Sequence, residues 1–107
     1  MKRLFLAALM ALSLGAFAQA DPEFKLVIEN HKFTPETVNV PAGKKFKLIV
    51  DNRDSTPEEF ESHSLKREKV IPGKSSATIM IGPLKPGEYK FVGEFHEATA
   101  KGVIVAK

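Results

Sequence analysis

The sequence has no cysteine among its 107 residues. This absence excludes disulfide bonds, thiol catalysis, iron–sulfur clusters and a thiolate ligand for any metal ion. Small domains that work outside the cytoplasm often use disulfides to supplement a small hydrophobic core. A domain without them depends on apolar packing, to which a bound metal ion could add.

The signatures of several other functional classes are also missing. Lysines and acidic residues are interspersed, so no basic patch indicates nucleic-acid binding. There are no heptads, internal repeats or low-complexity tracts, and neither a phosphate-binding loop nor a Ser-His-Asp order stands out. Paired carboxylates occur in hydrolases, but a domain of this size leaves little room for a substrate cleft. These absences argue against a stand-alone enzyme.

The N-terminal segment has the three parts of a secretory signal peptide. Lys2 and Arg3 form a charged start, residues 4–17 are an uncharged apolar run, and residues 18–20 read small-x-small. The alternative is a membrane anchor, but the run is shorter than the roughly 20 residues that span a bilayer, and no positive stop-transfer cluster follows it. We therefore predict that residues 1–20 are a cleaved signal peptide, that the protein is periplasmic, and that it has no stable membrane insertion after cleavage.

Cleavage after Ala20 would leave one domain, residues 21–107, with 87 residues because 107 minus 20 is 87. Loss of Lys2 and Arg3 leaves 14 of the 16 basic residues beside all 13 acidic residues. The net charge of the remaining domain is therefore about +1. The basic pI of the whole chain owes much to the segment that is removed.

Short β-rich runs separated by proline and glycine turns follow the signal segment, and this pattern predicts a β-sandwich or barrel. No convincing helical period appears, and residues 65–70 are left open as a turn. Met80 lies in an apolar strand, and Tyr89, Phe91 and Phe95 occupy alternate positions, so these four side chains are predicted to lie in the core. The predicted strands are residues 24–29, 37–40, 45–51, 60–65, 77–81, 88–95 and 102–106.

Five segments in this order and spacing resemble a cupredoxin. The resemblance implies an all-β, cupredoxin-like Greek-key β-sandwich, and it covers nearly all of the chain after residue 20. The segments that resemble the first half are residues 33–35, 38–43 and 46–52, and those that resemble the second half are residues 83–91 and 102–105.

A blue-copper cupredoxin binds copper through two histidines, one cysteine thiolate and a weak axial methionine. The resemblance places the upstream histidine near residues 58–60, the cysteine at Gly93, the second histidine at His96 and the methionine at Ala100. Only His96 matches a ligand. Because the intense colour of such sites needs a copper–thiolate bond, we predict that this is not a blue copper protein.

The sequence resembles more closely a divergent branch of cupredoxin-like periplasmic proteins, which accompany bacterial iron permeases of the elemental, ferrous iron uptake type. The acidic run at residues 58–62 with residues 65–68, and the run at residues 93–96 with residues 99–102, carry this resemblance. It implies the handling of ferrous or ferric iron, with copper as another bound ion. It also implies a partner, either an inner-membrane iron permease complex or another periplasmic iron-binding protein.

The residues themselves predict a metal site. Side chains two apart on a strand share a face, which groups the carboxylates of residues 59 and 61 and places residues 94 and 96 together in the same way. Cupredoxin topology brings the two segments to one end of the sandwich, and their carboxylates and imidazole suit iron, copper(II), manganese or zinc rather than copper(I). The predicted ligands are Glu59, Glu61, Glu94 and His96, with His63 and Glu97 as further candidates.

Simpler interpretations stay open for each of these residues. Two glutamates can form a solvated strand face, His63 can be a surface residue, and His96 can be a partly buried histidine that bonds to the closing loop. His31 lies in a turn and is predicted to be a loop residue outside the site.

The predicted function is that of a periplasmic, cupredoxin-like protein that binds iron or copper and serves ferrous-iron uptake, by assisting iron oxidation or by delivering iron to a permease. It would be a metal-binding or electron-transfer accessory protein. The alternative is a metal-free periplasmic interaction module whose acidic end docks a partner through charge.

Overall fold

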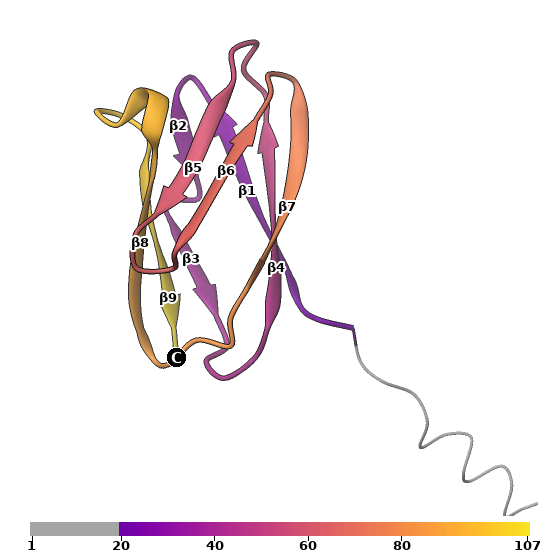
Figure 1. Cartoon of the computed structure of the whole chain (residues 1–107), viewed down its shortest axis with the longest axis vertical. Coiled ribbons are helices and arrows are strands. Elements are labelled where there is room, and N and C mark those ends of the chain that lie inside the picture. The colour runs from indigo at the N-terminus through magenta and orange to yellow at the C-terminus, as the bar shows by residue number, and fades with distance from the viewer. Residues whose placement is uncertain (1–19) are drawn as a thin grey trace, which may run out of the picture.

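The structure is a computed structural model and describes residues 20–107. These residues form two β-sheets, with strand orders β2-β1-β4-β7 and β3-β9-β8-β5-β6, and a 3-10 helix, η1 (Figure 1). The elements in chain order are β1 (Glu23–Glu29), β2 (Lys32–Thr34), β3 (Thr37–Val40), β4 (Phe46–Asn52), β5 (Glu58–Ser62), β6 (Arg67–Ile71), β7 (Ser75–Ile81), β8 (Gly87–Gly93), η1 (Glu94–His96) and β9 (Lys101–Ala106).

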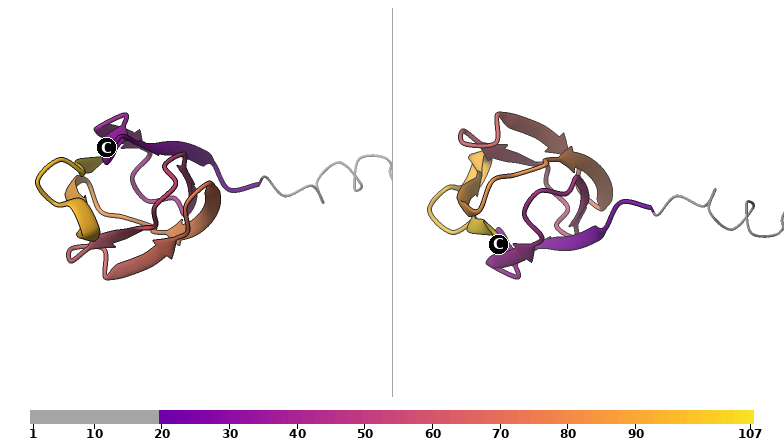
Figure 2. Two further views of the ribbon diagram at one scale, coloured as in Figure 1. Left: turned by 90° about the horizontal axis from the view of Figure 1, so that it is seen from above. Right: turned by 90° about the horizontal axis from the view of Figure 1, so that it is seen from below.

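The chain passes repeatedly between the two sheets, which face each other around the core (Figure 2). β1 pairs in parallel with β4, and β3 pairs in parallel with β9, whereas the other pairs are antiparallel. Parallel neighbours need a crossover connection, because a tight hairpin can join only antiparallel strands. This arrangement confirms the predicted all-β, cupredoxin-like Greek-key β-sandwich.

Alternation along the strands builds the core. In β4 every second residue from Phe46 is buried, which is the period of two that a strand with one face on the core requires. Phe33, Phe60 and Phe91 meet between the sheets, with ring centroids 4.9 Å apart for Phe33 and Phe91 and 5.1 Å apart for Phe60 and Phe91. Complete burial of each such side chain contributes about 1.5–3 kcal/mol. Phe60 lies on β5 and Phe91 lies on β8, the two strands that position the candidate site described below.

Two predicted core residues are instead exposed. Met80 is 39% exposed, because its neighbours Ile79 and Ile81 face inward and the alternation turns Met80 outward. Phe95 is 49% exposed, because β8 ends at Gly93 and the period of two ends with it. Phe91 is buried as predicted, and Tyr89 packs partly buried against the core.

The strand boundaries differ most around β5. The predicted strand at residues 60–65 begins earlier, at Glu58, and ends at Ser62, after which residues 63–66 form a turn. The segment left open at residues 65–70 mostly becomes β6, which pairs with β5. β2 was not predicted, since a strand of three residues carries too little alternation to be detected.

The predicted signal peptide falls almost entirely on residues 1–19, which lie outside the described residues, so the boundary between residues 1–20 and 21–107 stays a prediction. Within residues 20–107, no helix is both long enough and apolar enough to cross a membrane.

Candidate functional site

The centre of the candidate site is the buried carboxylate of Glu58, the first residue of β5. Glu58 is 1% exposed and faces the interior. Its Oε1 accepts hydrogen bonds from the main-chain N–H groups of Glu59 at 3.0 Å and Phe95 at 2.9 Å, and its Oε2 lies 2.7 Å from Nδ1 of His96. A buried carboxylate without partners would be very costly, so these contacts are what permit its burial.

Gly93 makes the space that the Glu58 side chain fills. A Cβ atom added at Gly93 would lie 2.7 Å from Cδ of Glu58 and 2.7 Å from Cβ of Ala100, closer than real Cβ contacts. Ala100 is fully buried, and its carbonyl accepts a hydrogen bond of 2.9 Å from the N–H of Gly93. The closing loop between β8 and β9 therefore packs directly over the Glu58 carboxylate.

A second histidine, His31, joins the site from the turn between β1 and β2. Its ring stacks on that of His96, with centroids 3.6 Å apart and planes 15° apart. The main-chain N–H groups of Asn30 and His31 donate to Asp54 at 2.8 and 3.0 Å, and Nδ1 of His31 lies 3.5 Å from the same carboxylate. The Thr99 hydroxyl, from the closing loop, donates to the carbonyl of His31 at 2.6 Å.

Hydrogen bonds set the charge state of Asp54. The N–H of His31 is the strongest influence that lowers the pKa of Asp54, and the N–H of Asn30 and the charges of His31 and His96 act in the same direction. Burial acts against them but does not reverse the shift. The carboxylate is thus held in its ionised form beside a turn whose two residues, Asn30 and His31, adopt left-handed backbone angles.

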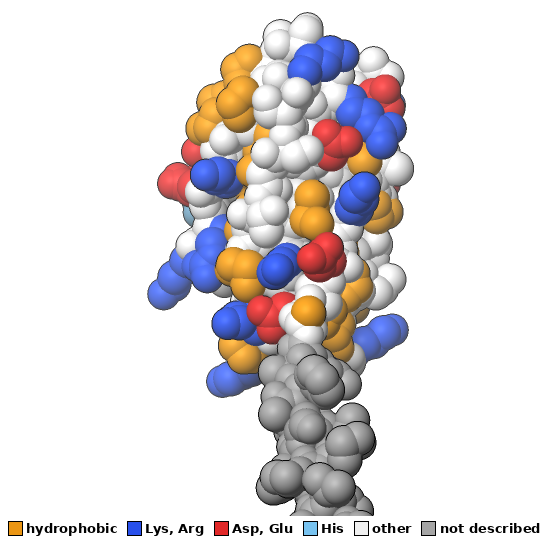
Figure 3. Space-filling model, turned by 90° about the vertical axis from the view of Figure 1, so that its right-hand side faces the viewer, with side chains coloured by type: hydrophobic (Ala, Val, Ile, Leu, Met, Phe, Trp, Pro, Cys, Tyr) orange, Lys and Arg blue, Asp and Glu red, His pale blue; other side chains and the backbone are white. Residues whose placement is uncertain are grey.

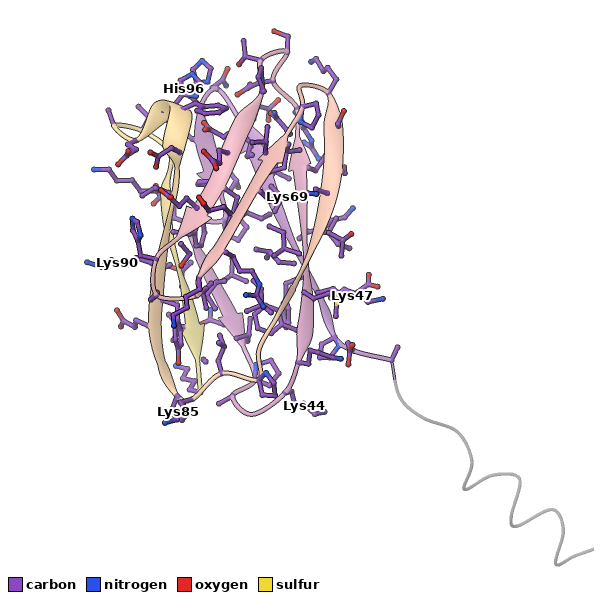
Figure 4. The ribbon with its side chains drawn as sticks, in the orientation of Figure 1. Lys44, Lys47, Lys69, Lys85, Lys90 and His96 are labelled. Atoms are coloured by element: carbon purple, nitrogen blue, oxygen red, sulfur yellow. The ribbon has the colours of Figure 1, made fainter. Side chains whose placement is uncertain are left out.

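His31 and His96 each have a carboxylate beside the Nδ1 atom. We call the end of the sandwich that carries these two histidines the histidine end, and Figure 4 labels His96 there. Such a partner fixes the orientation of the ring and leaves the other nitrogen free to act. The side chains of His31 and His96 are 43% and 29% exposed. Their nearly parallel planes do not direct both remaining nitrogens at a single metal ion, because the lone pairs lie in the ring planes.

A separate group of acidic side chains lies on the outward face of β5 and η1. The carboxyl of Glu61 lies within hydrogen-bonding reach of Glu94 and, as the largest influence, raises the pKa of Glu94. Glu97 and the charge of His63 act in the opposite direction. Nε2 of His63 lies 3.9 Å from Oε1 of Glu61, and a surface hollow of about 500 Å³ beside these two residues is also lined by Lys66. We call the set Glu61, His63, Glu94 and Glu97 the outer carboxylate group.

The structure divides the six predicted ligands between two places. His96 faces inward to Glu58, whereas the other predicted ligand of η1, Glu94, contacts Glu61 outside, because η1 does not keep the alternation of β8. Glu59 is half-buried on the outward face of β5 and joins the inner site only through its main-chain N–H. Among residues 20–107, no group of three or more His, Asp or Glu side chains is arranged to hold a metal ion. The metal ligands therefore stay a prediction.

Sequence reasoning missed three residues of the histidine end. Glu58 could have been found, because Phe60 is buried and the period of two then turns Glu58 inward as well. His31 and Asp54 carry no such signal. They are 23 residues apart, and only the folded chain brings their turns together beside His96.

Comparison with known proteins gives the class. The family model of the cupredoxin-like domain matches residues 2–106, and the chain therefore belongs to the cupredoxin-like domain family. It is also 49% identical over 83 residues to the uncharacterized protein RP394 of Rickettsia prowazekii (strain Madrid E). That match covers 78% of this chain and 66% of RP394, so the chain spans just under two thirds of this relative's length.

Solved structures of copper proteins share the fold. Auracyanin A, a blue copper protein of Chloroflexus aurantiacus, gives a TM-score of 0.70 at 10% identity, over 82% of this chain and 100% of that chain. The metal-binding domain of the Streptococcus pneumoniae Cu(I)-exporting P-type ATPase CopA gives 0.70 at 12% identity, over 86% and 91%. Identities this low support the fold alone.

The residues of this chain do not fit the copper site of a blue cupredoxin. Gly93, which the resemblance places at the cysteine position, provides no ligand and has no room for a side chain beside Glu58. Ala100, at the methionine position, provides none either. The space between them is filled by a carboxylate that already bonds to His96. No step that requires a copper–thiolate bond can be assigned to this chain.

Proposed function

We propose that this protein is a periplasmic member of the cupredoxin-like family that binds iron or copper ions at its outer carboxylate group and serves ferrous-iron uptake. The single observation that carries the proposal is the contact between Glu61 and Glu94, in which one carboxyl raises the pKa of the other. Family membership and the carboxylate-rich sequence of β5 support it.

The chemistry of the outer carboxylate group suits a cation. Two neighbouring carboxylates disfavour each other's ionisation, and a bound cation relieves that repulsion. Oxygen donors with one imidazole, that of His63, suit iron and copper(II) better than copper(I). His63, Glu94 and Glu97 are exposed, Glu61 is half-buried, and Lys66 and Arg67 lie close by, so the group would hold an ion weakly. Weak binding fits an ion that is cargo and is passed on to an iron permease or another periplasmic iron-binding protein.

Calorimetric titration of the exported protein with copper(II), ferrous and ferric ions tests this proposal. At least one ion should bind, and Glu61→Gln and Glu94→Gln should each weaken binding about tenfold or more, since each removes an oxygen ligand and a charge. Glu29→Gln is the matched control, because Glu29 is an exposed glutamate on β1, in the other sheet, and should bind as the unaltered protein does. The proposal is wrong if no ion binds, or if all three variants bind alike.

A metal-free interaction module is the second candidate, and a different observation favours it. His96, which the resemblance places at a copper-ligand position, is already bonded to the buried carboxylate of Glu58. Phe95 lies exposed beside that pair and, with the acidic residues of the same end, offers a partner both apolar and charged contacts. If no ion binds, but the protein still binds an iron permease and Phe95→Ser removes that binding, the second candidate replaces the first.

A further inference from the structure

Three segments meet at the end of the sandwich opposite His96. The turn between β3 and β4 bonds to the loop between β7 and β8 through the N–H of Gly43 and the carbonyl of Leu84, at 2.8 Å. The same turn bonds to the residue after β9, because the N–H of Ala42 donates to the carbonyl of Lys107 at 3.3 Å. These bonds join the segments into one continuous surface.

Lysine side chains occupy this surface. Lys44 and Lys45 follow the β3–β4 turn, Lys85 lies in the β7–β8 loop, and Lys107 follows β9, and all four are exposed. Lys44 and Lys85 lie at the end of the molecule opposite His96 (Figure 4). The space-filling view shows basic side chains projecting around this lower end (Figure 3). We call the four residues the lysine end.

Nearby acidic residues offset part of this charge, because Asp21, Glu23 and the exposed Glu88 lie near the same end. Glu23 pairs with a different lysine, Lys47, at 3.9 Å. Asp21 is half-buried, in a hollow of about 220 Å³ that Lys44 and Lys45 also line. The opposite end of the sandwich carries the carboxylates of Glu58 and Asp54 and also the basic residues Arg53 and Lys74. Both ends therefore carry charges of both signs, and the lysine end is distinguished by four exposed lysines from three segments.

The chain also enters the domain at the lysine end. Pro22 accepts a hydrogen bond of 2.9 Å from the N–H of Lys47, which fixes the start of β1 there. Only residues 18–22 separate the apolar run of residues 4–17 from β1, and they span at most about 18 Å. If residues 4–17 act as the predicted signal peptide and lie in the membrane during export, the lysine end is the part of the domain closest to the bilayer.

We propose that the lysine end binds the surface of an anionic lipid bilayer by electrostatic attraction. Lys44, Lys45, Lys85 and Lys107 contact the headgroups, and the histidine end faces away from the membrane. Basic residues near an anionic surface are each attracted to it, and their stems can lie along apolar surface, which half-buried Ala42 and Leu84 provide here. An acidic polypeptide is the competing partner, but the position of the chain entry favours lipid. The proposal does not depend on the metal proposed above.

Vesicle binding tests the proposal. The exported protein should bind vesicles that contain phosphatidylglycerol and should not bind vesicles of phosphatidylcholine alone. Each lysine lost should weaken binding roughly fivefold, so Lys44→Gln combined with Lys85→Gln should weaken it about 25-fold. Binding should also fall as salt is raised to about 0.15 M, where the Debye length is about 8 Å.

The control is the double variant Lys32→Gln and Lys69→Gln, which removes the same charge from exposed lysines of β2 and β6. It should bind phosphatidylglycerol vesicles within about twofold of the unaltered protein, because its lysines lie away from the bilayer in the proposed orientation. Equal loss in both double variants would overturn the proposal, since attraction would then follow net charge alone. No binding to vesicles, or binding to polyglutamate in place of vesicles, would overturn it as well.

Discussion

At the scale of single residues, the buried carboxylate of Glu58 determines which groups the histidine end can offer to a ligand, because it bonds to His96. A glutamate this deeply buried is rare unless it is paired, and here two main-chain N–H groups and one imidazole satisfy it. Glycine at position 93 and alanine at position 100 are the small residues that leave room for it. The absence of a cysteine at position 93 and the presence of a buried carboxylate at Glu58 are therefore linked. The side chain of a cysteine at position 93 would overlap with Glu58 in its present position.

The pairing predicts a stability effect at His96. His96→Ala would leave the Glu58 carboxylate buried with one partner fewer, and breaking such a pair from one side costs about 3–5 kcal/mol when both partners are buried. His96 is 29% exposed, so we expect a smaller loss of about 2–3 kcal/mol. Urea unfolding of the metal-free protein measures it.

The double variant His96→Ala, Glu58→Gln is the control, because the amide carries no charge that needs a partner. It should recover part of the loss. If His96→Ala is no less stable than the unaltered protein, the hydrogen bond to Glu58 contributes nothing, and this account of the buried carboxylate fails.

At the scale of elements, alternation in the sequence predicts most of the strands, since a strand with one face on the core must repeat every two residues. The prediction of β3 matches the structure residue for residue. The prediction of which side chains share a face fails where the alternation stops. Residues 94 and 96 were expected to share a face, but η1 follows β8 and sends Glu94 outward and His96 inward. The contact of His31 with His96 depends on tertiary packing and leaves no trace in local sequence.

Asp54 joins the β4–β5 loop to the β1–β2 turn, and this contact predicts how the stability of the fold depends on pH. Its carboxylate in the β4–β5 loop accepts hydrogen bonds from the β1–β2 turn, and these hold the pKa of Asp54 below its ordinary value. A carboxyl with a lowered folded-state pKa stabilises the fold above its unfolded-state pKa of about 3.9, and this contribution is lost as the pH falls through the folded-state value. At pH 7, Asp54→Asn should therefore lower the free energy of unfolding by about 1 kcal/mol.

Denaturant unfolding from neutral to acid pH measures this difference. The gap between Asp54→Asn and the unaltered protein should shrink below about pH 3.9, where Asp54 itself becomes neutral. Asp54→Ala, which has no acceptor at all, should be the less stable variant at every pH. A gap between Asp54→Asn and the unaltered protein that stays constant down to acid pH would contradict the role given to the charge.

At the scale of the whole molecule, the two ends of the sandwich differ in the side chains that they carry. One carries His31 and His96 with their carboxylate partners. The other carries the start of β1 and lysines, of which Figure 4 labels Lys44 and Lys85. Sequence reasoning could count these charges but could not sort them by end, because the lysine end gathers residues from three separate segments. The proposed membrane contact and the proposed ion binding thus use different surfaces, and a domain held at its lysine end would keep the histidine end free for a partner.

The residues that form the core predict which form of the protein should remain folded after export and cleavage. The buried hydrophobic residues run from Leu26 to Ala106, and Phe24 is the first side chain that packs against them. Because this core forms within the described residues 20–107, we predict that cleavage after Ala20 leaves it intact. Mass spectrometry of the exported protein should show Asp21 as the first residue, and this form should melt cooperatively.

Further removal of residues 21–28 would delete Leu26 and Ile28 and remove β1 from between β2 and β4, so that form should fail to fold. An exported protein that keeps Met1, or a form without residues 21–28 that still melts cooperatively, would show that the domain begins elsewhere.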